Sequence, residues 1–214
     1  MPNAPSSFNG GTETTAAAYD AQGNPLFYVL RTANLTVYTP DNISLGSLGG
    51  VTTPSGDAFS LVMGEVAVVP IPGVCRAYYL FYTLGGSFGG AVCYARVNCP
   101  VGSAPVIQTY STILDLTYRS HTAIAVSKVR ADGTRILYDV SDTGAHYVTL
   151  SVGGGFSAVV RSSISLGAGN VDWELDLSPD GAKMAWTMST SAPLSSNVYV
   201  LNILASGDLD MNSK

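Results

Sequence analysis

Charged side chains are scarce in this sequence: Asp, Glu, Lys and Arg together make up 12% of its 214 residues. Only three residues are lysines, namely Lys128, Lys183 and Lys214, so Ser, Thr, Asn and Gly must cover much of the surface. Such a composition favours an extracellular or particle-bound protein over a typical cytosolic enzyme. Because the ten Lys and Arg residues are scattered and the net charge is -5, we expect no nucleic-acid partner.

Long apolar runs are also missing. The most hydrophobic stretch, at 66–71, ends at a Pro-Gly turn, and a membrane helix needs roughly 18 apolar residues, so we expect no membrane span. No segment carries apolar residues at i, i+3, i+4 and i+7 over the length of a helix, and the sequence therefore predicts strands. The first residues, MPNAPSSFNGG, have neither a basic region nor an apolar core, so the sequence as given shows no signal peptide.

Cysteine is rare, and its three copies, Cys75, Cys93 and Cys99, lie in one part of the chain. Cys75 and Cys93 fall near two neighbouring predicted strands, and because such strands lie about 5 Å apart, a cross-strand disulfide is one interpretation. The alternative is three small buried or half-buried thiols, since free cysteine is among the most buried residue types. No Cys-x-x-Cys pair occurs, and His121 and His146 are distant in sequence, so we expect no metal and no other cofactor.

What the sequence does contain is a repeated pattern centred on glycine. Four glycines, Gly23, Gly73, Gly133 and Gly181, are each followed within a few residues by an aromatic or aliphatic run, and subtraction of their positions gives intervals of 50, 60 and 48 residues. An apolar stretch precedes each glycine, and a second alternating run follows later. A repeat of this size, made of strand, tight turn, strand, loop and strand, is typical of a propeller blade. The sequence thus predicts an all-β protein, a β-propeller of about four blade-like repeats.

The repeats divide the chain into a lead-in at 1–11, a propeller at 12–205 and a polar tail at 206–214; the expected blades lie at about 12–50, 60–110, 118–166 and 170–205. Four blades form either a small ring or part of a larger propeller. A closed ring pins its last blade to its first to avoid exposed edges, and no spare strand is evident near residue 1. We therefore favour a partial propeller, completed by further blades or by a neighbouring subunit.

The fourth repeat has the most specific motif. Residues 173–203, WELDLSPDGAKMAWTMSTSAPLSSNVYVLNI, resemble the SPDG propeller repeat of TolB-like and WD-like proteins and of prolyl-oligopeptidase relatives. In this motif Pro179 presets φ, Asp180 accepts local hydrogen bonds and Gly181 permits positive φ. The resemblance implies a tight turn between two strands of one blade.

A broader similarity spans most of the chain. The order of AYDAQGNPLFYV, EVAVVPIPGVCRAYYLFYT, TAIAVSKVRADGTRILYDV and LDLSPDGAKMAW is similar to the N-terminal propeller of large surface proteins that gliding bacteria export by the type-nine secretion system. This resemblance implies a location outside the cell or at its surface. None of the short motifs that carry it is an active-site signature.

Polar residues near the start of each innermost strand are the candidates for a shared site, because these strands line the central channel of a propeller. They are Glu13, Glu65, His121 and Asp172, with Glu174 beside the last. If all of them point inward, they could bind a cation or a sugar at one mouth of the channel. The alternative is that they cap strand ends in water, since a shift of one residue turns a strand side chain to the opposite face.

The segment Gly85-Gly-Ser87-Phe-Gly89 matches the Gly-x-Ser-x-Gly motif of hydrolases letter for letter. That motif needs a strand followed by a helix, whereas this segment lies between two predicted strands. We therefore interpret it as a hairpin tip and predict no catalytic residue.

Four blade-like repeats without a qualified nucleophile, acid or base favour a non-catalytic, secreted or surface-associated module that binds protein or glycan. One alternative is a propeller enzyme, a glycan-active hydrolase or lyase, with Glu13, Glu65, His121 and Asp172 around the channel. Another is an assembly subunit whose open strand edge pairs with a neighbour.

Overall fold

The protein is all-β in the part of the chain that the structure describes. The computed structural model describes residues 15–31, 35–48, 65–86, 89–119, 122–141, 144–161, 170–191, 194–210 and 212–213. These residues form sixteen strands in four sheets, and in each sheet four strands pair antiparallel in the order of the chain. None of these segments contains a helix long and apolar enough to cross a membrane.

Each sheet is a meander of four strands. The first sheet contains β1 (Thr15–Tyr19), β2 (Pro25–Arg31), β3 (Leu35–Tyr38) and β4 (Ser44–Leu48). The second sheet contains β5 (Val66–Pro70), β6 (Ala77–Gly86), β7 (Gly89–Asn98) and β8 (Val106–Arg119). The third sheet contains β9 (Thr122–Val126), β10 (Arg135–Ser141), β11 (Gly144–Leu150) and β12 (Val160–Arg161). The fourth sheet contains β13 (Asn170–Leu177), β14 (Lys183–Ser191), β15 (Leu194–Ile203) and β16 (Leu209–Asp210).

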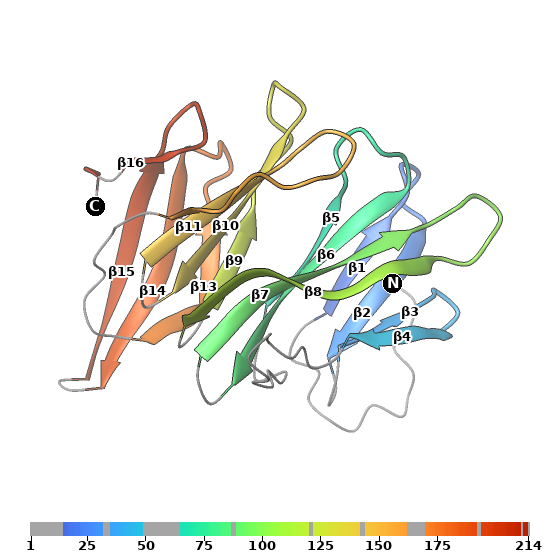
Figure 1. Cartoon of the computed structure of the whole chain (residues 1–214), viewed down its shortest axis with the longest axis horizontal. Helices are drawn as coiled ribbons and strands as arrows, with labels where there is room; N and C mark the ends of the chain where they lie inside the picture. The colour runs from blue at the N-terminus through green and yellow to red at the C-terminus, as the bar shows by residue number, and fades with distance from the viewer. Residues whose placement is uncertain are drawn as a thin grey trace.

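The four sheets follow one another as blades in a row (Figure 1). The first strands of successive sheets lie side by side, β1 against β5, β5 against β9, and β9 against β13. The first sheet is at one end of the row and the fourth sheet at the other. Among the described residues, buried apolar clusters join the first sheet to the second, the second to the third and the third to the fourth. No such cluster joins the described parts of the fourth and first sheets, so the blades form an open row.

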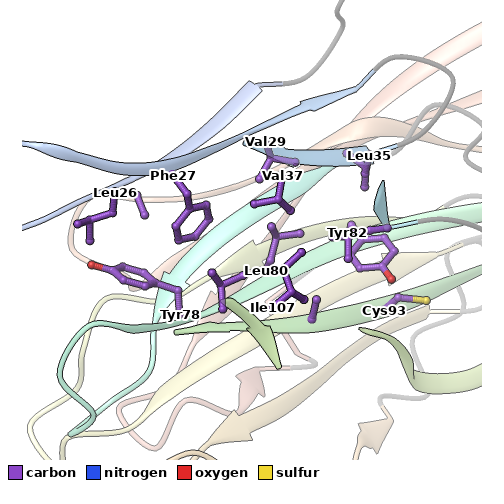
Figure 2. Packing of buried hydrophobic residues seen from close by; sticks show 14 of the residues in the cluster. Leu26, Phe27, Val29, Leu35, Val37, Tyr78, Leu80, Tyr82, Cys93 and Ile107 are labelled. Atoms are coloured by element: carbon purple, nitrogen blue, oxygen red, sulfur yellow. The ribbon is translucent and has the colours of Figure 1, made fainter. Parts of the chain in front are cut away.

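The core between the first two sheets consists of interleaved aromatic and aliphatic side chains (Figure 2). Phe27 and Val29 of β2 point toward Tyr78 and Leu80 of β6, and the rings of Phe27 and Tyr78 meet edge to face with centroids 5.6 Å apart. The Tyr78 hydroxyl donates to the carbonyl oxygen of Tyr19 at 3.1 Å. A ring that buries its carbon atoms and satisfies its hydroxyl at the rim stabilises the packing of one sheet on the next.

An aromatic cluster fills the core between the second and third sheets. Phe156, which follows β11, lies within 4.9 Å of Tyr79 and 4.8 Å of Tyr94, measured between ring centroids. Phe81 contacts the same rings. The third sheet contributes aliphatic side chains to this core, namely Ile124, Leu137, Val148 and Leu150. The second sheet therefore contributes both aromatic and aliphatic side chains to this core, and the third sheet contributes mainly aliphatic ones.

The core between the third and fourth sheets contains Trp186, which is 2% exposed. Its ring stacks on Tyr199 of β15 with centroids 5.4 Å apart. The indole Nε1 is buried without a protein hydrogen-bond partner, so the ring stabilises this core through packing alone. Burial of a side chain of this size contributes about 3 kcal/mol. Tyr138 of β10 donates its hydroxyl to the carbonyl oxygen of Gly207 at 2.9 Å, which ties the two sheets together at their rim.

The four repeat glycines occupy the turns between the first and second strands of their sheets. Their φ angles are +83° at Gly23, +72° at Gly73, +80° at Gly133 and +71° at Gly181, a region that glycine enters without steric cost. In the last of these turns the Asp180 carboxylate accepts a hydrogen bond from the Ser178 hydroxyl at 2.6 Å and from the Ala182 N–H at 3.0 Å. These are the roles expected from the turn chemistry of the sequence.

Two segments differ from the expected organisation. The second sheet continues through β8 to Arg119, beyond the expected blade limit at 110. In the segment expected to be a polar tail, Leu209 and Asp210 form β16 and pair with Ile203 and Asn202 of β15. Leu209 is 6% exposed and belongs to the core of the fourth sheet, which is why this polar segment is held against the blade.

Replacement of Gly207 by alanine tests the close approach of the fourth sheet to the third. A Cβ atom at Gly207, where φ is +90°, would lie 2.0 Å from Cδ1 of Ile136. Gly23 is the matched control, because its φ is +83° and no atom lies within 4 Å of its Cβ position. We expect Gly23→Ala to lower the free energy of unfolding by about 1 kcal/mol through backbone strain. Gly207→Ala should lower it by roughly 1–3 kcal/mol more through overpacking. Urea unfolding measures both changes, and equal losses would contradict the close packing.

Candidate functional site

Glu65 is the sequence candidate whose surroundings the structure describes most fully. It precedes β5, and its backbone N–H donates to the Thr83 hydroxyl at 3.0 Å while its carbonyl oxygen accepts the Thr83 N–H at 3.1 Å. The Glu65 carboxylate accepts the backbone N–H of Ile124 in β9. Since β5 and β9 are the first strands of neighbouring sheets, Glu65 joins the second blade to the third.

A second pair of polar side chains lies beside this bridge. Asp139 of β10 is opposite Ile124 of β9 on one side and opposite His146 of β11 on the other. Asp139 Oδ2 and His146 Nδ1 are 3.6 Å apart, and the two side chains are 10% and 4% exposed. They share a sheet face with Leu137 and Val148, which pack against the second sheet. The interface between the second and third blades therefore contains three buried or half-buried titratable groups.

The Asp139–His146 pair resembles the carboxylate–imidazole half of a catalytic triad, in which the carboxylate orients the base. Its position is unsuitable for direct contact with a substrate, because both side chains are buried between sheets. Leaving one member of a buried pair without the other costs several kcal/mol. Because Asp139 lies in β10 and His146 in β11, the pair links two neighbouring strands of the third sheet. Sequence reasoning did not identify Asp139. The short hairpin between β10 and β11, with Ser141 opposite Gly144, is the signal that would have placed it across from His146.

The other channel candidates lie wholly or partly outside the described residues. Glu13 and His121 lie outside the described residues. Asp172 and Glu174 lie in β13, where the pairing with β14 is irregular between Val171 and Leu175, and their side chains are not among those described. Convergence of these residues at one channel mouth therefore stays a prediction.

The Gly-x-Ser-x-Gly segment lies in a hairpin. Gly86 at the end of β6 pairs with Gly89 at the start of β7, so a strand follows the motif where a nucleophile elbow would have a helix. Ser87 itself is outside the described residues.

A cleft of about 660 Å³ opens between the turns of the third and fourth sheets. Lys128 and Arg130 line it, but both cations bind backbone: Lys128 Nζ donates to the Pro179 carbonyl at 2.7 Å and Arg130 Nη2 to the Ala205 carbonyl at 3.0 Å. Asp132 lies 3.9 Å from Arg130. The charges of this cleft thus hold the turns of the fourth sheet against the third.

Of the two interpretations of the cysteines, a disulfide between Cys75 and Cys93 is wrong, because all three cysteines are free thiols. Cys93 is opposite Tyr82 in the β6–β7 ladder and is packed in the first core (Figure 2). Cys75 lies in the turn before β6, so at least five residues of strand, roughly 17 Å, separate it from the position opposite Cys93. Burial raises the pKa of Cys93 to about 12 and that of Cys99 to about 11. Among the described residues, no group of three His, Cys, Asp or Glu side chains is arranged to hold a metal.

No protein-family model matches this chain, and no curated protein sequence matches it. Among solved structures, the chain is similar to the crystal structure of an endo-arabinase from Bacteroides thetaiotaomicron VPI-5482, with a TM-score of 0.44 and 13% identity. The similarity covers 91% of this chain and 75% of that chain. A likeness of this level says nothing about substrate or mechanism.

Removal of the Glu65 carboxylate tests its role as a bridge between blades. Glu65→Ala leaves the Ile124 N–H without its acceptor, so we expect a loss of about 1–3 kcal/mol in the free energy of unfolding. Glu65→Gln keeps an acceptor oxygen on a side chain of the same length, and its loss should be smaller. Urea unfolding and hydrogen exchange of the Ile124 amide measure the effect. Equal stability of Glu65→Ala and the unchanged protein would rule out the bridge.

Thiol labelling tests the cysteine assignment. The raised pKa values keep Cys93 and Cys99 protonated at about pH 8, and both side chains are buried, whereas Cys75 is exposed. A chromogenic disulfide reagent should therefore label Cys75 alone in the folded protein and all three cysteines in denaturant, with a Cys75→Ser variant as the control. If neither Cys75 nor Cys93 is labelled in denaturant without reductant, the two residues form a disulfide and the free-thiol assignment is wrong.

Proposed function

We propose that this chain is a non-catalytic interaction module, a β-propeller or part of one, that acts outside the cell or at its surface and binds protein or glycan. The observation that carries this proposal is that the titratable groups between the blades contact other groups of the protein itself. The Glu65 carboxylate accepts the Ile124 N–H, and Asp139 and His146 are enclosed together between two sheets. Glu65 thus connects two blades, and the Asp139–His146 pair joins two strands of one sheet, whereas a general base must lie within hydrogen-bond reach of its substrate.

The exposed carboxylates of the turns are also engaged locally. A hydrogen bond from the Thr134 side chain lowers the pKa of Asp132, and one from Ser178 lowers the pKa of Asp180. Both groups are therefore ionised at neutral pH, which makes them unsuitable as general acids. Their hydrogen bonds shape the turns that position the second strands of the blades.

Exposed apolar side chains support a role in binding. Val101, which is 82% exposed, and Val106, which is 53% exposed, flank one cleft of the second sheet, and Val198 and Val200 lie on the fourth sheet. Single exposed apolar residues are ordinary, but groups of them accompany interaction surfaces. The low lysine content supports a location outside the cytosol.

Turnover assays test the absence of catalysis directly. The purified chain, incubated with a panel of polysaccharides and peptides, should release no reducing ends and no peptide fragments above a buffer control, because its buried acid and base groups do not reach a substrate. Reducing-sugar assays and mass spectrometry provide the measurement. Turnover that is abolished by Glu65→Gln or His146→Asn, in variants that remain folded, would refute the proposal in favour of a propeller enzyme.

A further inference from the structure

β15 is a long strand whose outer neighbour covers only one end. β15 spans Leu194–Ile203, whereas β16 spans Leu209–Asp210 and pairs with Asn202 and Ile203 alone. In the second sheet, by contrast, β8 pairs with β7 from Gly90 to Asn98. Figure 1 shows β15 at one end of the row of sheets, with β16 at its tip. Residues 194–201 of β15 therefore have an outer edge with no neighbouring strand among the described residues.

The hydrogen bonds at the end of β15 show which backbone groups face this open edge. The Ile203 N–H donates to the Ala182 carbonyl at 2.7 Å, toward β14, and the Asn202 N–H donates to the Ser213 hydroxyl at 2.8 Å, on the other side. Because successive residues of an antiparallel strand direct their backbone groups to opposite sides, the N–H and C=O groups of Ser196, Val198 and Val200 face the open edge. No backbone hydrogen bond from the described residues reaches them on that side.

This edge has none of the features that protect edge strands from association. Natural proteins protect such edges with charged residues, proline or bulges. Residues 194–203, LSSNVYVLNI, contain neither a charged residue nor a proline, and the ladder with β14 runs without a register shift from Ser191 to Lys183. Two of the three side chains at the edge are apolar and exposed, since Val198 is 70% and Val200 is 42% exposed. A long, regular and uncharged edge of this kind favours the addition of another strand.

We propose that this edge pairs antiparallel with the same edge of a second copy of the chain, about a twofold axis at Val198. The proposal deepens the proposed function and rests on it, because it names the partner of the interaction module. Antiparallel pairing about a twofold axis matches each donor with an acceptor. It sets Val198 opposite Val198 and Ser196 opposite Val200, so no like charges meet across the ladder.

The length of the open edge is sufficient for such a ladder. Residues 195–201 provide an overlap of roughly 23 Å, and the pairing joins two four-stranded sheets into one of eight strands. This edge carries no charged side chain that could select a strand of an unrelated protein. A second copy of the chain presents the same uncharged side chains and the complementary backbone N–H and C=O groups. The net charge of -5 per copy opposes association, so the fraction of dimer should rise with salt.

Substitutions at Val198 test the proposal, because its N–H faces the open edge. Val198→Pro removes this donor without removing a hydrogen bond to β14. Val198→Lys keeps the donor and sets two like charges against each other across the twofold axis. Val198→Thr, which keeps both the donor and the β-branched side chain, is the matched control. Circular dichroism and thermal unfolding establish that each variant is folded.

Light scattering over a range of protein concentrations measures the outcome. The unchanged chain and Val198→Thr should reach twice the monomer mass of 22.2 kDa. Val198→Pro and Val198→Lys should each raise the dissociation constant on the order of tenfold or more. A monomer at every concentration would overturn the proposal, as would a dimer that persists in folded Val198→Pro and Val198→Lys.

A synthetic peptide of residues 194–203 separates a second copy from a foreign strand. The peptide should compete with the dimer and restore the monomer mass of the protein component. If the chain is monomeric on its own but binds the peptide, its edge accepts a strand without pairing with a second copy. This result would overturn the proposed dimer. Substrate turnover, by contrast, would refute the non-catalytic function and leave the dimer unaffected, so the two failures are distinguishable.

Discussion

The structure depends on the requirement that each internal sheet bury two apolar faces. In β6 the even-numbered residues Tyr78, Leu80 and Tyr82 face the first sheet, and the odd-numbered Tyr79 and Phe81 face the third. Successive strand side chains point to opposite faces, so one strand supplies both cores. A register shift of one residue would exchange the two sets and place differently shaped surfaces against each neighbour.

Hydrogen bonds at the rims of the sheets fix the relative placement of blades that the apolar cores hold together. The Tyr78 hydroxyl reaches the carbonyl of Tyr19, and the Tyr138 hydroxyl reaches that of Gly207. Arg130 reaches the carbonyl of Ala205 in the same region. Sheet-on-sheet packing by dispersion and apolar burial has little directionality, whereas these hydrogen bonds have preferred angles. They fix how each blade is placed against the next, and the Glu65 carboxylate has the same effect between β5 and β9.

The fourth sheet shows how a blade at the end of the row differs from an internal one. Its inward face carries Met184, Trp186 and Met188, which are buried. Its outward positions in β14 are the smaller Ala185 and Thr187, whereas the same outward direction in β10 carries Ile136 and Tyr138. In the described part of β14, the outward side chains are therefore smaller than those of an internal interface. The open strand edge is the feature of this sheet most suited to association.

The all-β class, the number of repeats and the turns could be predicted from the amino-acid sequence. The spacing and chemistry of Gly23, Gly133 and the Asp180-Gly181 turn act over a few residues, so they can be interpreted without the rest of the chain. The sequence also predicted that Glu65 lies near the start of an inner strand. It did not predict the hydrogen bond from Ile124 of the next blade, because that contact joins residues far apart along the chain.

Tertiary structure alone decided the remaining features. The separation of Cys75 from Cys93 depends on strand register, which the apolar pattern leaves free until neighbouring sheets pack. The incorporation of Leu209 into a blade likewise required the core of the fourth sheet. Local turn chemistry is encoded in short segments, whereas register and interfaces between blades follow from the burial of surfaces that many distant residues build together.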